Sequence, residues 1–510
     1  AGHPLAALAG AEVMRSGGNA VDAAITMAAV LGVVRPHMNG LGGDAFLLLR
    51  DGRSGDVRAL NGSGRAGQWA TPEFFRARGL DAMPETGIHS VTVPGAVLAW
   101  ADALRESGTI TLAQALAPAI GIAENGFPVS AKLAAAIAER RAKLETDSAM
   151  RRTFLPGGAP PAVGSILRLP DLARSLRLIA ANGPDALYVG ELAARIDAFM
   201  RAEDGTVTVE DLATHSSTWQ QPIWTAYRGY RVAAFPPNSQ GLTLLLAMNL
   251  AEQFDLDAAG HNSAAYIHLL VEIKKLAYRE RDRYLTDPAF TEIPLDRLLS
   301  KEFARELAVE LGLPAPSDST VGDDSGDTVY LAAVDRDGNA VSMIQSLYSS
   351  FGSGRMVPET GIVLHNRGAL FSLDPEHVNV VAPGKRTFHT LAPSLALREN
   401  GSLFMVFGSP GGDGQPQTLL EVFNNIVVFG MSPQHAVEAP RWRSYSDGRL
   451  EVEPGIAEDV RDALERYGHR VEVADEPSAL GGAQVILIDP VTGVRFAAAD
   501  PRREAYAIAW

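Results

Sequence analysis

Cysteine is absent from the 510 residues of this chain. Its absence excludes disulfide bonds, thiolate nucleophiles, cysteine-ligated zinc and iron–sulfur clusters. A chain without thiols tolerates reducing and oxidising compartments alike, so the composition does not choose between them. We expect the cytoplasm, or the periplasm or the exterior if an upstream signal has been removed.

Long hydrophobic runs and an excess of positive charge are missing as well. The nearest approach to a membrane span is the apolar run over residues 23–34, which is shorter than the ~18 residues that a span needs. Lys and Arg number 45 against 60 Asp and Glu, so the formal net charge is −15. Nucleic-acid binding needs the opposite balance. We therefore expect neither a membrane span nor a nucleic-acid partner.

Motifs for metals and nucleotides are weak. The 11 histidines form no HExxH motif and no close pair with ligand spacing. Gly62-Ser-Gly-Arg-Ala-Gly67 matches G-x-G-x-x-G, so a nucleotide-binding oxidoreductase is the alternative from another class. That fingerprint needs a helix to begin inside the glycine run, whereas Thr71-Pro72 predicts a later helix start. The sequence favours a protein with no metal and no cofactor.

The composition is that of a globular protein, with 46% hydrophobic and 21% charged residues. Helical patterns dominate the first 320 residues and strand patterns the rest, which predicts an α+β layered body. A Pro/Ser/Asp/Gly-rich stretch over residues 314–327 predicts a solvated linker between them. Helices are predicted at 4–16, 21–34, 94–106, 112–123, 130–145, 170–182, 191–201, 264–284, 417–428 and 456–467. Strands are predicted at 45–49, 57–60, 328–334, 340–346, 362–364, 394–397, 403–407 and 484–488, with a strand-to-helix junction at 207–213.

The junction between Asp327 and Thr328 suggests a catalytic nucleophile. A hydroxyl residue opens a strand directly after the acidic linker. If the chain is cut before Thr328, that residue holds both a hydroxyl nucleophile and a new α-amine. An α-amine has a pKa near ~7.7–8.0 and can take the hydroxyl proton without a histidine. The alternative is that Thr328 only begins a β-strand, where threonine is common.

Two further features belong to the same hypothesis. A hairpin that pairs Val334 with Ala340 places Ser346 opposite Thr328, about 5 Å away across the strands. The run Gly408-Ser-Pro-Gly411-Gly412 follows a predicted strand and precedes a helix. Its unobstructed N–H groups suit an oxyanion hole, although a tight turn would need the same glycines. We expect this loop to lie near the surface.

These residues resemble the γ-glutamyltransferase (glutathione hydrolase) family. The resemblance is carried by Asp327-Thr-Val-Tyr-Leu-Ala-Ala-Val-Asp-Arg-Asp-Gly-Asn-Ala-Val-Ser342, by Phe351-Gly-Ser-Gly354 and by the glycine run ending at Gly412. Shorter matches occur in the same order along the whole chain: Gly17-Gly-Asn-Ala-Val-Asp-Ala-Ala24, Gly40-Leu-Gly-Gly43, Val93-Pro-Gly95, Asn182-Gly-Pro-Asp185, Tyr227-Arg-Gly-Tyr230, Pro236-Pro237, Asp287-Pro288, Ala439-Pro-Arg441 and Asp500-Pro-Arg502.

The resemblance implies an N-terminal nucleophile hydrolase that is made as one precursor. It would cleave itself between Asp327 and Thr328 into a large subunit, residues 1–327, and a small subunit, residues 328–510. The two would stay associated in one αββα body, with a higher oligomer open. By the family pattern Thr328 is the nucleophile, Ser346 supports it, and Gly411 and Gly412 stabilise the oxyanion. A family scaffold that has lost catalysis is the remaining alternative, and the intact set argues against it.

The substrate-binding positions depart from γ-glutamyl-specific members. Ser63 stands where the family has the arginine that binds the glutamyl carboxylate, and Tyr348 stands where it has an asparagine. Arg367 and Leu370 correspond to the two residues that hold the α-amino group. His389 and Thr390 correspond to the paired serines. We expect a rebuilt acyl pocket in which Arg65, Arg367 and His389 bind one carboxylate of a small amide or peptide substrate. A true γ-glutamyl transferase is the alternative, and the sequence does not choose between hydrolysis and transfer.

Overall fold

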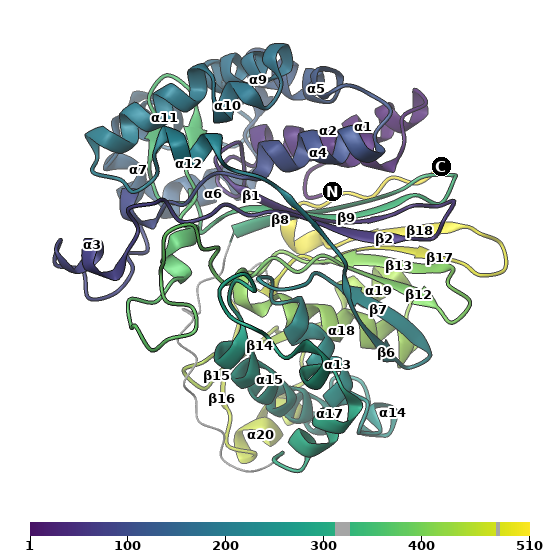
Figure 1. The fold of residues 1–510 in the computed structure, drawn as a ribbon. Coiled ribbons are helices and arrows are strands. Elements are labelled where there is room, and N and C mark those ends of the chain that lie inside the picture. The colour runs from purple at the N-terminus through teal and green to yellow at the C-terminus, as the bar shows by residue number, and fades with distance from the viewer. Residues whose placement is uncertain (312–326, 476–479) are drawn as a thin grey trace.

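Two antiparallel β-sheets lie face to face, and a layer of helices covers the outer face of each sheet (Figure 1). The computed structural model describes residues 1–311, 327–475 and 480–510. Its helix–sheet–sheet–helix order confirms the predicted α+β class and the αββα sandwich that the resemblance implies. The N-terminus lies beside the C-terminal segment, where the Ala1 amine donates a hydrogen bond to the Tyr506 carbonyl oxygen at 2.9 Å.

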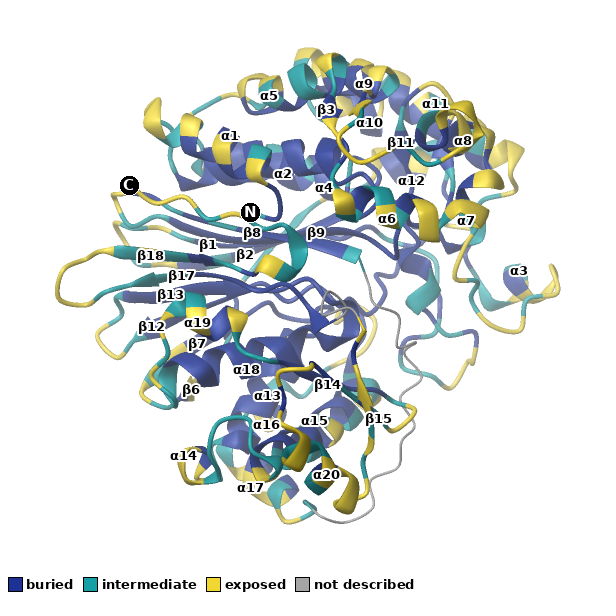
Figure 2. Ribbon diagram, turned by 180° about the vertical axis from the view of Figure 1, so that it is seen from behind, coloured by how far each residue is buried: buried dark blue, intermediate teal, exposed yellow. Residues whose placement is uncertain are grey.

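The first sheet joins strands from distant parts of the sequence. In spatial order its strands are β5 (Thr218–Gln220), β2 (Val57–Gly62), β1 (Asp44–Arg50), β9 (Ala340–Tyr348) and β8 (Asp327–Val334). Successive side chains of a strand point to opposite faces. Phe46 therefore packs between the sheets, while Leu47 packs against the helices. Figure 2 shows that both sheets are buried along most of their length.

The second sheet also mixes early and late segments. Its order is β18 (Arg495–Ala499), β17 (Gln484–Ile488), β13 (Leu403–Gly408), β12 (Ser394–Arg398), β7 (Tyr230–Ala234) and β6 (Ile223–Tyr227). The sequence analysis did not predict β5, β6 or β7. The predicted segregation of helices and strands is therefore too simple, because segments before residue 320 contribute strands to both sheets.

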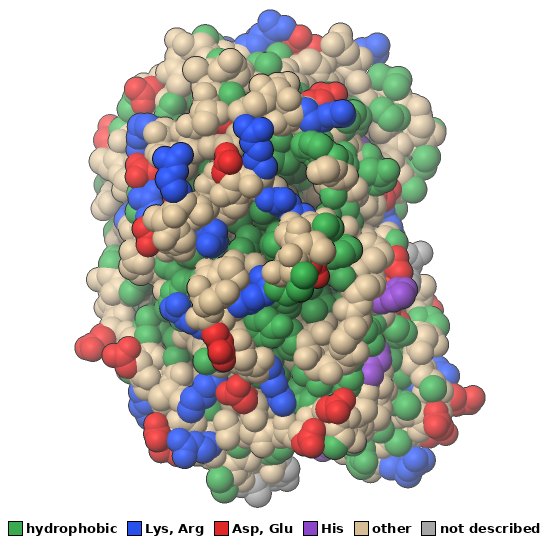
Figure 3. Space-filling view, turned by 90° about the vertical axis from the view of Figure 1, so that its right-hand side faces the viewer, with side chains coloured by type: hydrophobic (Ala, Val, Ile, Leu, Met, Phe, Trp, Pro, Cys, Tyr) green, Lys and Arg blue, Asp and Glu red, His purple; other side chains and the backbone are tan. Residues whose placement is uncertain are grey.

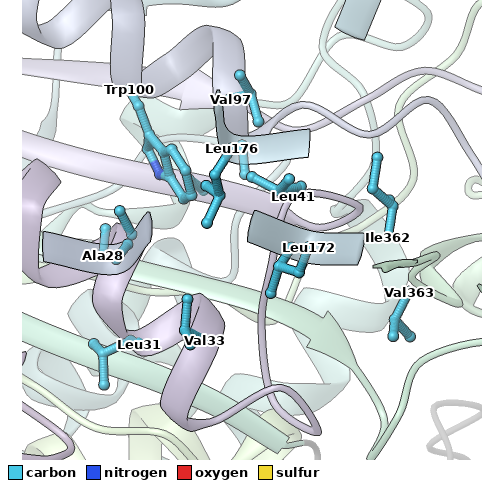
Figure 4. Packing of buried hydrophobic residues seen from close by; sticks show 14 of the residues in the cluster. Ala28, Leu31, Val33, Leu41, Val97, Trp100, Leu172, Leu176, Ile362 and Val363 are labelled. Carbon is cyan, nitrogen blue, oxygen red and sulfur yellow. The ribbon is translucent and has the colours of Figure 1, made fainter. Parts of the chain in front are cut away.

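The helical layer over the first sheet is built around α2 (Ala20–Val34), which is buried along its whole length. A helix that is apolar nearly all round must lie inside the protein. Its N-terminus is closed by a capping box between Asn19 and Asp22. Figure 4 shows Ala28 of this helix near Trp100 of α4 and Leu176 of α9. This layer comprises α1 (Pro4–Arg15), α4 (Ala96–Ser107), α5 (Leu112–Asn125), α6 (Ala131–Glu139), α7 (Arg141–Glu145), α8 (Ser148–Phe154), α9 (Pro170–Asn182), α10 (Asp185–Tyr188), α11 (Glu191–Ala202) and α12 (Val209–Ala213).

The second helical layer centres on α13, which packs against the second sheet and against α15. It comprises α13 (Gly241–Ala251), α14 (Leu256–Ala259), α15 (Ala264–Tyr284), α16 (Leu295–Leu298), α17 (Lys301–Ala308), α18 (Gln415–Val427), α19 (Pro433–Glu438) and α20 (Glu458–Arg466). A small sheet of β14 (Trp442–Ser444), β15 (Arg449–Val452) and β16 (Arg470–Val473) flanks it. The short pairs β3 (Phe127–Pro128) with β4 (Ile166–Leu167), and β10 (Met356–Val357) with β11 (Ile362–Val363), lie outside the two main sheets.

Most predicted elements are confirmed within one or two residues. The helix predicted at 130–145 is two helices, because the chain leaves the helical conformation at Arg140. At 207–213 only the short helix α12 is present, and its N-cap hydroxyl, Thr208, accepts a hydrogen bond from the Asp211 N–H. The predicted strand there is wrong. Of the predicted linker, only Asp327 lies within the described residues, as the first residue of β8.

A broad groove opens at the end of the sandwich that carries the β1–β2 and β17–β18 turns. Its volume is about 1800 Å³. Figure 3 shows hydrophobic side chains in its hollowed middle and Lys and Arg side chains around them. Val334, at the far end of β8 from Thr328, lines it. The lining on β8 extends from Val334 to Ala332, which is four residues, or about 13 Å, from Thr328, and Thr328 itself does not line the groove.

Candidate active site

The β8–β9 hairpin brings Thr328 and Ser346 together. Its turn is held by the Asp335 carboxylate, which accepts hydrogen bonds from the backbone N–H groups of Asp337 and Asn339 at 3.0 Å each. With this turn fixed, Val334 pairs with Ala340 and Thr328 pairs with Ser346. The register predicted from the sequence is confirmed.

Three hydrogen bonds meet at the Ser346 hydroxyl. Thr328 Oγ1 donates to Ser346 Oγ at 3.0 Å, and the Tyr348 N–H donates to the same oxygen at 2.7 Å. Ser346 Oγ in turn donates to the carbonyl oxygen of Asp327 at 2.8 Å. A hydroxyl offers one donor and two acceptor sites, so Ser346 is fully used. The acceptor of the hydrogen bond that Ser346 donates is the carbonyl oxygen of Asp327, which belongs to the peptide bond before Thr328.

The glycine loop after β13 lies beside the start of β8. Gly408 packs against the Tyr330 ring, two residues beyond Thr328 in that strand. Gly411 and Gly412 have φ values of +137° and +54°, which L side chains rarely adopt. Both are buried, which corrects the expectation of a surface loop. Within the described residues, neither N–H makes a hydrogen bond. Buried N–H groups without partners are rare, and they suit a site that receives an oxyanion.

Side chains from α13 and α15 hold this loop in place. Gln240, at the N-cap of α13, donates from Nε2 to the carbonyl oxygens of Gly412 at 3.0 Å and Thr390 at 2.7 Å. Arg281 of α15 forms a buried ion pair with Asp413 and donates to Gln240 Oε1 at 3.2 Å. The loop is thus held in place through a backbone carbonyl group and through the Asp413 side chain.

Asp44 is a third residue on the face that carries Thr328 and Ser346. It begins β1 and stands opposite Ser346 in the pairing of β1 with β9. Side chains opposite each other in an antiparallel pair point to the same face. The sequence analysis missed Asp44, although a carboxylate at the head of the otherwise apolar run Asp-Ala-Phe-Leu-Leu-Leu is an unusual core residue.

Four groups surround the fully buried Asp44 carboxylate. Its Oδ1 accepts from the Gly64 N–H at 3.1 Å. Its Oδ2 lies 3.1 Å from His389 Nε2, 3.3 Å from Arg367 Nε and 3.3 Å from His365 Nδ1. Buried charges persist in proteins when they are paired and hydrogen-bonded in this way. Asp44 is therefore enclosed by the protein and already engaged by Gly64, His389 and Arg367.

The two histidines of this cluster differ in their contacts. His389 Nδ1 accepts from the Leu391 N–H at 3.3 Å, so the ring proton resides on Nε2 and is donated to Asp44. Burial lowers the pKa of His389 to about 3, which keeps the ring neutral. His365 Nε2 lies 2.9 Å from the Thr92 carbonyl oxygen. Burial alone would raise the pKa of Asp44, but the neighbouring His365 and the bond from His389 hold it well below its usual range.

Arg367 connects Asp44 to the predicted acyl pocket. Its side chain is about 1% exposed. Nη1 donates to Thr390 Oγ1 at 3.3 Å, and the guanidinium carbon lies 4.6 Å from the centre of the Tyr348 ring. Nη2 has no hydrogen-bond partner among the described residues. Burial lowers the pKa of Arg367, and Asp44 opposes that shift. A buried guanidinium with one unused nitrogen is a natural contact for one carboxylate oxygen.

Two other predicted substrate-binding residues, Arg65 and Ser63, differ in whether their side chains are bound within the protein. Arg65 is half-buried, and its guanidinium has no hydrogen bond or ion pair within the described parts of the chain. Its charge adds to burial in lowering the pKa of Arg386 to about 10, which places the two arginines near each other. The Ser63 hydroxyl donates to Asn61 Oδ1 at 2.7 Å and accepts from Asn238 Nδ2 at 3.3 Å. Ser63 is thus engaged within the protein.

His389 also differs from its predicted role. Both of its ring nitrogens are used, one by Asp44 and one by the Leu391 N–H. The expectation that His389 binds a substrate carboxylate is not supported by these contacts, because burial and internal bonding leave the ring no free donor. Of the predicted substrate-binding residues, Arg65 and Arg367 are the two that keep a guanidinium nitrogen without a hydrogen-bond partner among the described residues.

The glycines at 62–67 have a structural explanation. A Cβ on Gly64 would lie 1.5 Å from the Val93 carbonyl oxygen, and one on Gly67 would lie 2.0 Å from that of Thr206. The next helix, α3 (Pro72–Arg76), begins five residues after Gly67, with Thr71 as its N-cap. The helix that follows the glycine run in the sequence does not begin inside it, so the strand–loop–helix arrangement of a dinucleotide fingerprint is lacking.

Comparisons with known proteins agree with this architecture. The family model described as gamma-glutamyltranspeptidase matches residues 6–510. The chain belongs to the γ-glutamyltranspeptidase family. It is 42% identical to the glutathione hydrolase-like YwrD proenzyme of Bacillus subtilis, over 99% of this chain and 97% of the relative. It is 39% identical to the oxamate amidohydrolase proenzyme of Klebsiella pneumoniae, over 98% and 96%.

A solved structure is equally similar. The cephalosporin acylase from Bacillus halodurans superimposes with a TM-score of 0.92 at 40% identity, over 100% of this chain and 94% of that one. As a member of the γ-glutamyltranspeptidase family, the chain is an enzyme: an autoprocessing N-terminal nucleophile hydrolase that works by amide hydrolysis or acyl transfer. Within the described residues, no helix combines the length and apolarity needed to cross a bilayer.

Proposed function

We propose that this family member cuts its own chain between Asp327 and Thr328 and then uses Thr328 to hydrolyse amides whose acyl group carries a carboxylate. The observation that carries the proposal is the hydrogen-bonded series Thr328–Ser346–Asp327, in which the nucleophile and the carbonyl to be attacked share one serine. The large subunit, residues 1–327, and the small subunit, residues 328–510, would remain joined by the two mixed sheets.

Self-cleavage follows from these contacts. The Ser346 hydroxyl polarises the Asp327 carbonyl and stabilises the charge that develops on its oxygen. Thr328 Oγ1 attacks the Asp327 carbonyl carbon, the peptide C–N bond breaks, and the hydroxyl proton passes to the departing nitrogen. Water then hydrolyses the resulting ester. The products are a carboxylate at Asp327 and a free hydroxyl and α-amine at Thr328.

Turnover reuses the same atoms. The α-amine of Thr328 takes the hydroxyl proton, and the oxygen attacks the substrate amide carbonyl. The N–H groups of Gly411 and Gly412 supply the donors for the tetrahedral oxyanion. The amide C–N bond breaks, the amine product leaves with the proton, and an acyl ester remains on Thr328. Water or an acceptor amine releases the acyl group.

The charges around Asp44 indicate the acyl class. Asp44 is fully buried and already paired with Arg367 and His389, so the ammonium of a γ-glutamyl group would have to compete with these partners for it. Arg367 keeps Nη2 unused, and Arg65 has no partner within the described chain. Together they favour an acyl chain that ends in one carboxylate, such as a short dicarboxylic monoamide. The alternative of a true γ-glutamyl transferase requires Arg65 to replace the family's arginine and an unidentified group to hold the ammonium.

Trapping the acyl-enzyme tests this proposal. Processed protein is mixed with excess glutaryl p-nitroanilide, quenched in acid within the first turnovers and digested for mass spectrometry. We expect a glutaryl adduct on the peptide that begins with Thr328. An adduct on another residue, or nitroaniline release with Thr328 unmodified throughout, would contradict it.

A further inference from the structure

The second helical layer holds a group of metal-ligating side chains far from Thr328. His268 and Glu272 lie four residues apart on α15, and so on one face of that helix. His469 lies in the connection from α20 to β16. One ligand atom from each of the three lies within 4.8 Å of the others. His268 Nδ1 and His469 Nε2 are only 2.8 Å apart.

The backbone of His469 is fixed by the way α20 ends. Its N–H donates to the Leu464 carbonyl at 3.2 Å, while the Gly468 N–H donates to the Glu465 carbonyl at 2.9 Å. Gly468 has φ of +93°, and this pair of bonds is the Schellman motif of a helix C-terminus. The histidine is therefore held on a rigid helix end, and its ring lies against that of His268 with the centroids 5.0 Å apart.

We propose that His268, Glu272 and His469 form a binding site for a divalent cation of the zinc type. Two imidazole nitrogens and one carboxylate oxygen are a ligand set that Zn²⁺ prefers, with a fourth position left for water. Tetrahedral coordination at ~2.0–2.1 Å needs ligand nitrogens about 3.3 Å apart, so the two rings separate by roughly half an ångström on binding. All three residues are partly exposed, which gives the ion an entry path.

Lys275 is the competitor for Glu272 in this structure. Its Nζ donates to Glu272 Oε1 at 2.7 Å. The lysine side chain is about 42% exposed, so it can turn into solvent when the carboxylate takes a cation. Because the lysine end of this ion pair is solvated, the pair contributes little stability, and its loss does not oppose binding strongly.

The site joins segments on either side of the Asp327–Thr328 bond. His268 and Glu272 precede it, and His469 follows it. If the chain is cut there, which rests on the proposed function, the bound ion connects the two subunits directly. We expect it to stabilise their association, because a ligand that binds only the assembled protein shifts the equilibrium towards assembly.

Calorimetric titration with ZnCl₂ tests the site on two proteins without an affinity tag, the processed enzyme and Thr328→Ala. Because the site needs no cleavage, both should bind one ion with the same affinity. His469→Gln and Glu272→Gln should each weaken binding at least tenfold, whereas His435→Gln, which changes an exposed histidine outside the cluster, should bind as wild type. Melting curves without metal verify that the variants fold. Wild-type affinity in folded His469→Gln, or no binding to wild type, would overturn the site.

The subunit connection has its own readout. In urea, 1 mM zinc should raise the concentration at which processed subunits separate, and His469→Gln should abolish the shift. Binding without such a shift would overturn the stabilising role and leave the site intact. A chain that is never cut but still binds zinc would contradict the proposed function and not the site.

Discussion

The Ser346 hydroxyl donates a hydrogen bond of 2.8 Å to the carbonyl oxygen of Asp327. That carbonyl belongs to the peptide bond before Thr328, whose own hydroxyl donates to the same serine at 3.0 Å. One side chain thus contacts both the group that would attack and the group that would be attacked. The β8–β9 register, set by the turn at Asp335, produces this arrangement.

Ser346→Ala should slow self-cleavage on the order of 10²-fold, the usual cost of removing one oxyanion donor. The substitution removes the hydrogen bond that Ser346 Oγ donates to the Asp327 carbonyl oxygen. Ser346→Thr keeps a hydroxyl and should process at a rate near that of wild type. The measurement is the time course of band splitting after refolding. Equal rates for the alanine variant and wild type would show that the serine takes no part.

Gly412→Val should lower kcat on the order of 10²-fold by displacing an N–H of the proposed oxyanion hole. The residue has φ of +54°, so a branched side chain also strains the backbone. Gly430→Val is the control for that strain, because Gly430 has φ of +64° and lies outside the site. The measurement is kcat of the processed wild type, Gly412→Val and Gly430→Val by steady-state kinetics. Unchanged kcat in folded Gly412→Val would mean that the glycine only shapes a turn.

Sequence reasoning reached the parts of the site that depend on local structure. The turn at residues 335–339 fixes the hairpin, and the hairpin fixes Thr328 opposite Ser346, so simple counting was sufficient. The Asp44 cluster was missed because its members come from four separated segments: Asp44, Gly64, the stretch at His365 and Arg367, and His389. The pair His268–His469, 201 residues apart, was invisible for the same reason.

Contacts between distant segments also limited what could be predicted of the fold. The spacing of apolar residues predicted the bounds of α9 and α15 to the residue, because the apolar repeat of a long amphipathic helix lies within consecutive residues of the sequence. It did not find β6 and β7: β6 pairs with β7, and β7 takes its place in the second sheet by pairing with β12, more than 150 residues later. Strand order is a long-range property, and the sequence pattern of a short strand does not contain it.

Substrate preference is the next expected outcome. A glutaryl anilide should have a higher kcat/KM than the γ-glutamyl anilide, which differs only by an α-ammonium group. Burying that ammonium without an anionic partner is costly, and Asp44 is already paired with Arg367 and His389. A clear preference for the γ-glutamyl anilide would contradict the rebuilt pocket.

Arg65→Gln provides the matched variant for that comparison. The guanidinium has no hydrogen bond or ion pair within the described chain, so its loss should leave the melting temperature nearly unchanged. KM for the glutaryl anilide should rise about tenfold or more, whereas KM for an uncharged pentanoyl anilide should not. Equal effects on both anilides would remove Arg65 from carboxylate binding.

Stability should fall on acidification through the buried His389. Folding lowers the pKa of this ring to about 3, from ~6.5 in the unfolded chain. Below pH 6.5 the unfolded state binds the extra proton and the folded state does not, so this contribution is complete above pH 6.5 and is lost as the pH falls. Between pH 6.5 and 5 it amounts to about 2 kcal/mol.

His389→Gln isolates that contribution, because Gln keeps a donor for Asp44 but does not titrate. Urea unfolding at pH 7 and pH 5 should show a smaller loss of stability for this variant than for wild type. An equal loss in both proteins would mean that His389 becomes protonated within the folded enzyme.

The most direct measurement is the mass and N-terminal sequence of the fragments of purified wild type and Thr328→Ala. The account predicts two wild-type fragments, the smaller running from Thr328 to Trp510 with a free threonine amine. It predicts a single uncut chain for Thr328→Ala, because the attacking hydroxyl is gone. Cleavage of Thr328→Ala at the same bond, or a wild-type fragment that begins at another residue, would contradict it.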